Sequence, residues 1–195
     1  MPALILLLRH GATEWSLAGR HTGRTDLPLT ALGERQASEA ATLVTNLLAG
    51  AQPLVFTSPL ERAVRTAELA LPDHYAEPMS SLTEYDYGDY EGLTSREILA
   101  RDPNWDLFED GCPGGEKIQQ VTARCDAFIA KMERVAAGRV VVAVTHGHLS
   151  RLLTARLLGL SPGTAASLWN DTGSVGVINE HRGRLVLVGW NRVAG

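Results

Sequence analysis

Residues 4–8 form an unbroken apolar run that stops abruptly at Arg9-His10-Gly11. A run that is apolar at every position predicts a strand covered on both faces, as in a parallel sheet. Ligands of open α/β sheets bind beyond the carboxyl ends of the strands. Arginine offers a planar fork for a phosphate or carboxylate, and the imidazole beside it is a base, a nucleophile or a metal ligand. The stretch therefore predicts an anion site that contains a reactive imidazole.

The same pattern recurs later in the chain. Residues 139–145 form a second apolar run, which ends in His146-Gly147-His148 and precedes a helix expected over residues 149–158. The histidine pair is also a cue for a metal site, but no carboxylate or cysteine accompanies it in the pattern. We therefore expect no metal and no cofactor here.

A third apolar run, residues 53–57, is followed by Ser58-Pro59. We predict that these two residues are the N-cap and the first residue of a helix, because proline needs no hydrogen-bond acceptor at that position. The helix carries Arg62 one turn from its start. Since it begins at the carboxyl end of a strand, Arg62 can point into the same crevice as His10.

The remaining elements complete an alternation of strands and helices. The pattern predicts an α/β fold, a three-layer sandwich whose mostly parallel central sheet is flanked by helices. We expect helices at 31–48 with Thr30 as N-cap, 94–101, 115–136 and 162–169, a short edge strand within 75–80, and a closing hairpin of strands 175–179 and 184–190.

Length and composition restrict the class of protein. A chain of 195 residues fits a single domain, 1–195. The net charge of −4 gives no global support to nucleic-acid binding. Cys112 and Cys125 form no CxxC pair, which disfavours a zinc site or a disulfide framework and favours a cytoplasmic location. The apolar start lacks the basic region of a signal peptide, and no run reaches the ~20 residues of a membrane span.

Four segments together resemble the histidine phosphatase superfamily, which includes the cofactor-dependent phosphoglycerate mutases. Its first signature is similar to residues 8–16, Leu-Arg-His-Gly-Ala-Thr-Glu-Trp-Ser, and its second to residues 58–67. The family pattern Leu-x-Glu-x-x-x-Gly-x-x-Glu-Gly matches residues 82–92, and its last signature is similar to Thr-His-Gly-His at 145–148. The resemblance implies a phosphoglycerate mutase-like fold.

The resemblance also implies a role for each matching residue. His10 is the expected nucleophile, Glu84 the proton donor, and His146 lies against the transferring phosphoryl group. The residues expected to bind the phosphate or substrate are Arg9, Arg62, Ser16, Thr22 through its hydroxyl, and Gly23 through its backbone amide.

Several positions leave alternatives open. Asp86 or Asp89 is the rival proton donor, whereas Glu91 and His148 are expected to be structural. The segment Thr172-Gly173-Ser174 borders the site on one reading and lies outside it on another. Trp105 and Phe108 are expected to fill the core, and the acids around them, Asp106, Glu109 and Asp110, would repel a second phosphate placed nearby.

These residue types predict a mechanism. Arg9, Arg62 and a protonated His146 would neutralise the phosphoryl oxygens, His10 would attack phosphorus, and Glu84 would protonate the leaving oxygen. We expect a metal-independent phosphomonoesterase that acts through a phosphohistidine intermediate, on a small phosphorylated metabolite such as a sugar phosphate. A homodimer is a candidate assembly.

The alternatives are a phosphoglycerate mutase and a non-catalytic module that binds phosphorylated ligands. Glycolytic mutases of the family place an arginine pair and other basic residues in an insertion after the acid, and they commonly have asparagine where Ser16 stands. Between Glu91 and Val121 this chain has only Arg96, Arg101 and Lys117. Both departures favour the phosphatase, and a binding module would have no need of a proton donor.

Overall fold

The computed structural model describes residues 1–194 and is built on a six-stranded sheet with the order β3-β2-β4-β1-β5-β6. The strands are β1 (Leu4–Arg9), β2 (Leu54–Thr57), β3 (Ala76–Pro78), β4 (Val140–Thr145), β5 (Val175–His181) and β6 (Arg184–Arg192). The helices are α1 (Glu14–Leu17), α2 (Ala31–Leu48), α3 (Glu61–Ala70), α4 (Ser95–Arg101), α5 (Leu107–Asp110), α6 (Ile118–Val135) and α7 (Gly147–Leu157), with short 3-10 turns η1 (Ser80–Leu82), η2 (Gly88–Tyr90) and η3 (Pro162–Ser167).

Strands β1 to β4 run in the same direction, and β5 forms the antiparallel pairs of the sheet, with β1 on one side and β6 on the other. β1 pairs in parallel with β4, with Leu4 opposite Val140 and Arg9 opposite Thr145. β2 lies in parallel between β4 and the edge strand β3. β5 runs antiparallel to both β1 and β6, which confirms the expected closing hairpin. The mostly parallel sheet predicted from the apolar runs is therefore confirmed.

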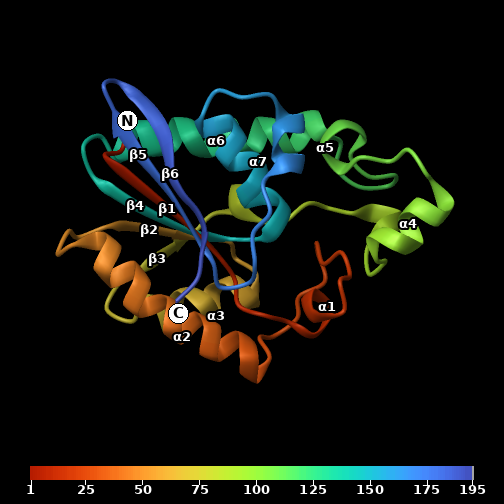
Figure 1. Cartoon of the computed structure of the whole chain (residues 1–195), viewed down its shortest axis with the longest axis horizontal. Coiled ribbons are helices and arrows are strands. Elements are labelled where there is room, and N and C mark those ends of the chain that lie inside the picture. The colour runs from red at the N-terminus through yellow and green to blue at the C-terminus, as the bar shows by residue number, and fades with distance from the viewer. Residues whose placement is uncertain (195) are drawn as a thin grey trace.

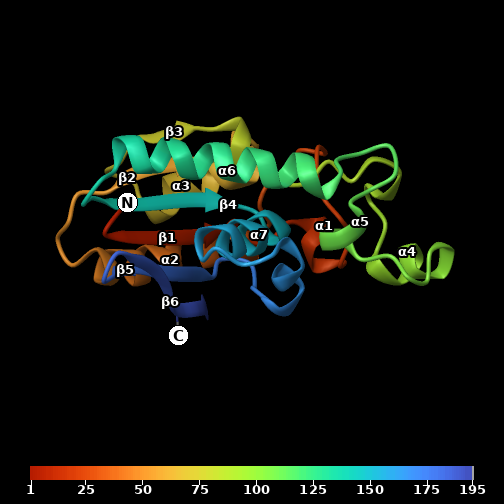
Figure 2. The same ribbon diagram turned by 90° about the horizontal axis from the view of Figure 1, so that it is seen from above.

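Helices cover both faces of the sheet (Figures 1 and 2). Alternate residues of β1 point to opposite faces, so Leu6 and Leu8 pack with α2 and α3. Ile5 and Leu7 point to the other face of the sheet and pack with α6 and α7. The strands are apolar at every position because each face contacts a helix layer.

Some boundaries differ from the expectations. A short helix, α1, which is absent from the expected elements, begins at Glu14, where the side chain of Thr13 caps it by accepting from the Ser16 amide. The predicted cap at Ser58 is wrong: α3 begins at Glu61, and the carboxylate of Asp26 accepts from the Glu61 amide. The Ser58 hydroxyl accepts from the Leu60 amide just ahead of the helix and also bonds His146. The stretch after Pro162 is the 3-10 turn η3.

The parallel strands bring three distant segments to one edge. The His10 amide donates to the Thr145 carbonyl over 2.9 Å, and the Ser58 amide donates to the Val144 carbonyl over 2.9 Å. The residues that follow β1, β2 and β4 are therefore neighbours. Among residues 1–194, no helix is long and apolar enough to cross a membrane.

Candidate active site

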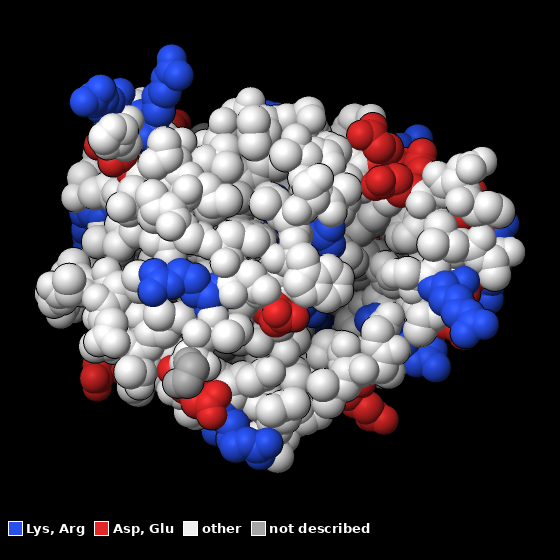
Figure 3. All heavy atoms as spheres, viewed as in Figure 1, with Lys and Arg blue, Asp and Glu red and all other residues white. Residues whose placement is uncertain are grey.

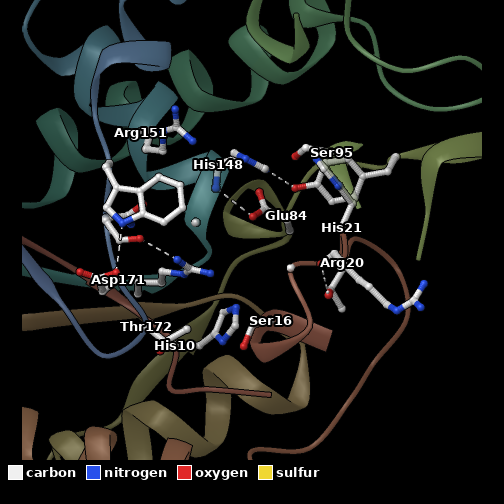
Figure 4. Close-up of a pocket in the computed structure, with 17 residues that line it drawn as sticks. His10, Ser16, Arg20, His21, Glu84, Ser95, His148, Arg151, Asp171 and Thr172 are labelled. Carbon is white, nitrogen blue, oxygen red and sulfur yellow. Dashed lines mark hydrogen bonds between the residues drawn. The ribbon is translucent and has the colours of Figure 1, made fainter. Parts of the chain in front are cut away.

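A pocket of about 260 Å³ lies beyond the carboxyl ends of β1 and β4. Its lining comes from the end of β1, the segment around α1, the start of α7 and the segment after η3 (Figure 4). The space-filling view shows a hollow at this end of the molecule, with basic side chains, drawn in blue, visible at its edge (Figure 3). Of the predicted site residues, Arg9, His10, Ser16, Thr22 and Glu84 line this pocket.

His10 is held in one tautomer. Its Nδ1 lies 2.7 Å from the Gly11 carbonyl, and because a carbonyl only accepts, Nδ1 carries the proton. Nε2 is then left with a lone pair and has no protein partner within residues 1–194. Burial, followed by the charges of Arg62 and Arg9, lowers the pKa of His10 well below its ordinary value. The imidazole is therefore neutral, as a nucleophile must be.

Arg9 supplies free hydrogen-bond donors beside His10. Nη1 donates to the Asn170 carbonyl over 2.6 Å and Nε is buried without a partner, which leaves Nη2 as the donor without a hydrogen bond to residues 1–194 that is not sealed off. Gly147 permits this placement, because a Cβ there would lie 3.1 Å from the Arg9 Cζ. A charged arginine with an unused donor suits a phosphoryl oxygen.

His146 lies behind His10, with the ring centroids 5.1 Å apart. Its Nδ1 accepts from the Nε of Arg62 over 3.2 Å, so its proton is on Nε2, 2.8 Å from the Ser58 Oγ. Burial and then the charge of Arg62 lower the pKa of His146 well below its usual value. This structure does not support the protonated His146 of the sequence-based mechanism, because an arginine already donates to it.

Arg62 is fully buried, and most of its donors are used by the protein. Besides His146, it donates to the carbonyls of Thr25 at 2.9 Å and of Thr22 and Gly23 at 3.0 Å each. It is not part of the pocket lining. In this structure Arg62 holds the loop after α1 in place and adds positive charge close behind the pocket.

Glu84 reaches the pocket from the segment before η2, although it is 95% buried. Its Oε1 accepts from the amides of Tyr85 and Leu149, and its Oε2 accepts from the amide of His148. The carboxyl group is thus fixed against the first turn of α7. Oε1 takes two bonds and Oε2 only one, so Oε2 is the oxygen with room for a proton.

The rival acids do not reach the pocket. Asp86 pairs with Arg24, and neither Asp86 nor Asp89 is part of the lining. The other lining carboxylate is Asp171, where hydrogen bonds from Asn191 and Trp169 lower the pKa. Asp171 is therefore held as an anion, which leaves Glu84 as the candidate proton donor.

The loop after α1 differs in detail from the expectation. The Gly23 amide donates to both carboxylate oxygens of Glu91 over 3.0 Å, so it is not free for a phosphate, and Gly23 does not line the pocket. A Cβ at Gly23 would lie 2.2 Å from the Tyr85 carbonyl oxygen, which explains the glycine. Ser16 and Thr22 do line the pocket, and the hydroxyl of Ser16 donates to the Thr13 carbonyl. Glu91 is structural, as expected.

Sequence reasoning missed part of the pocket wall. His148, expected to be structural only, does bond the Tyr87 hydroxyl through Nδ1 at 2.6 Å, but it also lines the pocket. His21 stacks on it, with ring centroids 5.4 Å apart. Arg151 was not singled out at all. Its spacing of four residues from Gly147 was the available signal, because i and i+4 share one helix face.

The remaining open positions are also placed by the structure. Thr172 lines the pocket, and the Gly173 amide donates to the carbonyls of Arg9 and His10. Phe108 is buried in the core, as expected. Asp106, Glu109 and Asp110 do not line the pocket. Within residues 1–194, no group of three or more His, Cys, Asp or Glu side chains is arranged to hold a metal ion.

Comparison with known proteins agrees with this geometry. The family model for the histidine phosphatase superfamily (branch 1) matches residues 5–193. The chain belongs to the histidine phosphatase superfamily. This histidine phosphatase is 39% identical to an acid phosphatase of Mycobacterium tuberculosis over 179 residues, which covers 92% of the chain and 87% of that relative. It is 35% identical to a sedoheptulose 1,7-bisphosphatase of Saccharomyces cerevisiae over 190 residues, 82% and 70% of the two chains.

A solved structure of a Mycobacterium tuberculosis open reading frame superposes with a TM-score of 0.94 at 37% identity, covering 98% of each chain. The fold is therefore that of known phosphoglycerate mutase-like proteins. The histidine phosphatase described here is an enzyme, a phosphatase homologous to acid phosphatases.

The buried histidines of this phosphatase make its stability depend on pH. Burial is the first cause that lowers the pKa values of His10, His146 and His148 below the ordinary 6.5. As the pH falls below about 6.5, the unfolded chain therefore takes up protons that the folded chain does not. Stability present above that pH should be lost below it, by up to ~1.4 kcal/mol per pH unit for each histidine.

Denaturant unfolding measured between pH 7.5 and about 5 tests this expectation. His10→Asn should make the slope of stability against pH shallower, because one such group is gone. His181→Asn, in the exposed hairpin, is the control and should leave the slope unchanged. Equal slopes in wild type and His10→Asn would show that His10 is not held neutral by the fold.

Proposed function

We propose that this phosphatase hydrolyses a small phosphorylated metabolite, such as a sugar phosphate, through a phosphohistidine on His10 and without a metal ion. The observation that carries the proposal is the tautomer of His10. Its Nδ1–H donates to the Gly11 carbonyl, so the bare Nε2 is the nucleophilic atom, next to the unused donor of Arg9.

In the first step, the Nε2 lone pair attacks phosphorus and the bond from phosphorus to the ester oxygen breaks. That oxygen takes the proton from Glu84 and leaves as the alcohol. The Nδ1–H bond to Gly11 stays in place and stabilises the positive charge that develops on the ring. Arg9, by contact with the phosphoryl oxygens, and Arg62, from its position behind the pocket, stabilise the negative charge of the transition state.

In the second step, the Glu84 carboxylate accepts a proton from water as the water oxygen attacks phosphorus. The bond from Nε2 to phosphorus breaks, its electron pair returns to the imidazole, and inorganic phosphate is released. Glu84 is again protonated and His10 is again neutral. One carboxyl group therefore serves as acid and then as base.

The pocket favours a phosphatase over a mutase. The basic residues of the segment after the acid, Arg96, Arg101 and Lys117, do not line it. The exposed indole of Trp169 at its rim offers an apolar face to a sugar ring. One of the relatives is named as a sugar bisphosphatase, which supports a sugar phosphate as substrate. A non-catalytic role is not favoured, because binding a phosphorylated ligand would not need a carboxyl group in the same pocket as His10.

Hydrolysis should therefore continue in EDTA and should need no added 2,3-bisphosphoglycerate. Phosphate release from a panel of phosphorylated metabolites, measured with and without each addition, tests the proposal. Loss of activity in EDTA that one divalent cation restores would contradict the metal-free mechanism. Phosphoryl transfer between positions of phosphoglycerate at a rate that rivals hydrolysis would contradict the choice of a phosphatase.

A further inference from the structure

Glu84 presents its carboxyl group to the pocket from a segment without regular structure. Residues 83–87 lie between the turns η1 and η2 and belong to no helix or strand. The carboxyl group itself is held by the amides of His148 and Leu149 at the start of α7 (Figure 4). The backbone that carries it needs a separate anchor, because no sheet or helix hydrogen bonds fix it.

That anchor is the side chain of Arg124, which extends from α6. Its Nη1 donates to the carbonyls of Ser81 and Thr83, and its Nη2 donates to the Glu84 carbonyl over 3.1 Å. Its Nε and Nη2 also donate to the two carboxylate oxygens of Glu116, over 2.8 and 2.9 Å. A guanidinium has five N–H groups, and these five bonds use all of them.

Glu116 holds the backbone on the other side of Glu84. The Glu116 Oε2 accepts from the Asp86 amide over 2.9 Å, and the Glu116 amide donates to the Asp86 carbonyl over 2.8 Å. Together Arg124 and Glu116 therefore fix the chain both before and after the side chain of Glu84. Each of the two side chains is only 17% exposed, so water competes little for these charge-assisted bonds.

Neither Arg124 nor Glu116 lines the substrate pocket. Both line a second cavity of about 430 Å³, and Glu84 is the residue that the two cavities share. Since every N–H group of Arg124 already has an acceptor, it has no donor left for a ligand in the second cavity. These contacts point to support of Glu84 rather than to the binding of a ligand.

We propose that Arg124, together with Glu116, is a positioning residue for the reaction, because it holds the backbone of Glu84 where the carboxyl group reaches the leaving oxygen. The proposal rests on the proposed function, in which Glu84 is the proton donor. Displacement of a reacting group by ~1 Å costs on the order of a hundredfold in rate. Substrate binding should depend little on the pair, because Arg9 and His10 are held by other contacts.

Phenyl phosphate and nitrophenyl phosphate test the proposal, because they differ in one ring substituent and phenolate is the more basic leaving group. Release of the phenol in a single turnover, with enzyme in excess, reports the first step alone. Arg124→Met should slow this step about tenfold to a hundredfold with phenyl phosphate and much less with nitrophenyl phosphate. The KM of either ester should change little. A general loosening of the fold would slow both esters equally.

Arg156→Met is the matched control. Arg156 also forms a bidentate pair with a carboxylate of α6, Asp126, but it lines neither cavity, so its loss should leave the ratio of the two rates unchanged. Arg124→Lys has three donors in place of five and should fall between wild type and Arg124→Met. When Glu84→Gln is already present, adding Arg124→Met should not change the ratio further, because the group that Arg124 positions has no proton to give.

Circular dichroism checks that each variant is folded. If Arg124→Met is not, Arg124→Lys and Glu116→Gln decide the matter, and each should lower the rate more with phenyl phosphate than with nitrophenyl phosphate. No loss, or equal losses with the two esters, would overturn the proposal if Glu84→Gln still distinguishes between them. Equal losses in Glu84→Gln would show instead that the proposed function has the wrong proton donor, and the role of Arg124 would fall with it.

Discussion

Replacing His10 by alanine should abolish turnover, with a fall in kcat of at least about 10⁴-fold, while the fold is retained. Among the histidines that line the pocket, His10 is the one that follows Arg9 at the end of β1. His146 has both ring nitrogens occupied, by Arg62 and by Ser58. The loss should be the same for every substrate, because both steps of the reaction pass through His10. Steady-state hydrolysis of nitrophenyl phosphate measures it.

The control for this variant is His181→Ala, which removes an imidazole from the exposed hairpin and should leave kcat unchanged. Circular dichroism and binding of vanadate should show that His10→Ala is folded and still recognises a phosphate-like anion through Arg9. Residual turnover within about a hundredfold of wild type would mean that a different group, or water itself, attacks phosphorus.

Glu84→Gln should impair the enzyme by an amount that depends on the leaving group. A sugar alkoxide is strongly basic and must be protonated as it leaves, so the variant should lose about 10²–10⁴-fold with a sugar phosphate. Nitrophenolate leaves without a proton, so the loss should be much smaller with nitrophenyl phosphate when the first step is limiting. Hydrolysis of both substrates by the one variant gives the two losses.

The ratio of the two losses is more informative than either alone. The glutamine places an NH₂ group among the amides of Tyr85, His148 and Leu149, and any resulting shift of the pocket affects both substrates. Asp89→Asn, outside the pocket, should change neither rate. Equal losses with both substrates would show that Glu84 only positions the start of α7 and that the proton comes from another source.

The activity profile should extend into mildly acidic solution. Burial and the nearby arginines lower the pKa of His10, so the nucleophile stays neutral below pH 6.5, where an ordinary histidine would gain a proton. The rate of hydrolysis should therefore depend on pH in a bell-shaped manner, with its maximum on the acidic side of neutrality.

The sheet and the central residues of the site could be predicted because local sequence determines them. Apolar runs such as Leu4–Leu8 are needed for strands covered on both faces, and parallel strands bring His10 and His146 to one edge. The presence of Glu84 in the pocket was predicted from a short motif. Its attachment to the amides of His148 and Leu149 was not, because no local pattern indicates which helix a loop carboxylate meets.

Departures from the expected contacts arise where a distant residue takes the place of a local partner. The Asp26 carboxylate accepts from the Glu61 amide at the start of α3, while the Ser58 hydroxyl bonds both the Leu60 amide and His146. Most donors of Arg62 bond His146 and the carbonyls of the loop after α1, and the Gly23 amide donates to Glu91 from a segment far away in sequence. Such contacts depend on the tertiary fold, and residue types at a given spacing do not specify them.

The most direct test of the central claim is to trap the enzyme during turnover. Wild type mixed with radiolabelled nitrophenyl phosphate and quenched within milliseconds should carry the label on the peptide that contains His10, in a form that is labile in acid and stable in base. His10→Ala should carry none. A label that is stable in acid and lies on a serine of the pocket, such as Ser16, would contradict the phosphohistidine mechanism. A label held as an acyl phosphate on an aspartate or glutamate would contradict it as well.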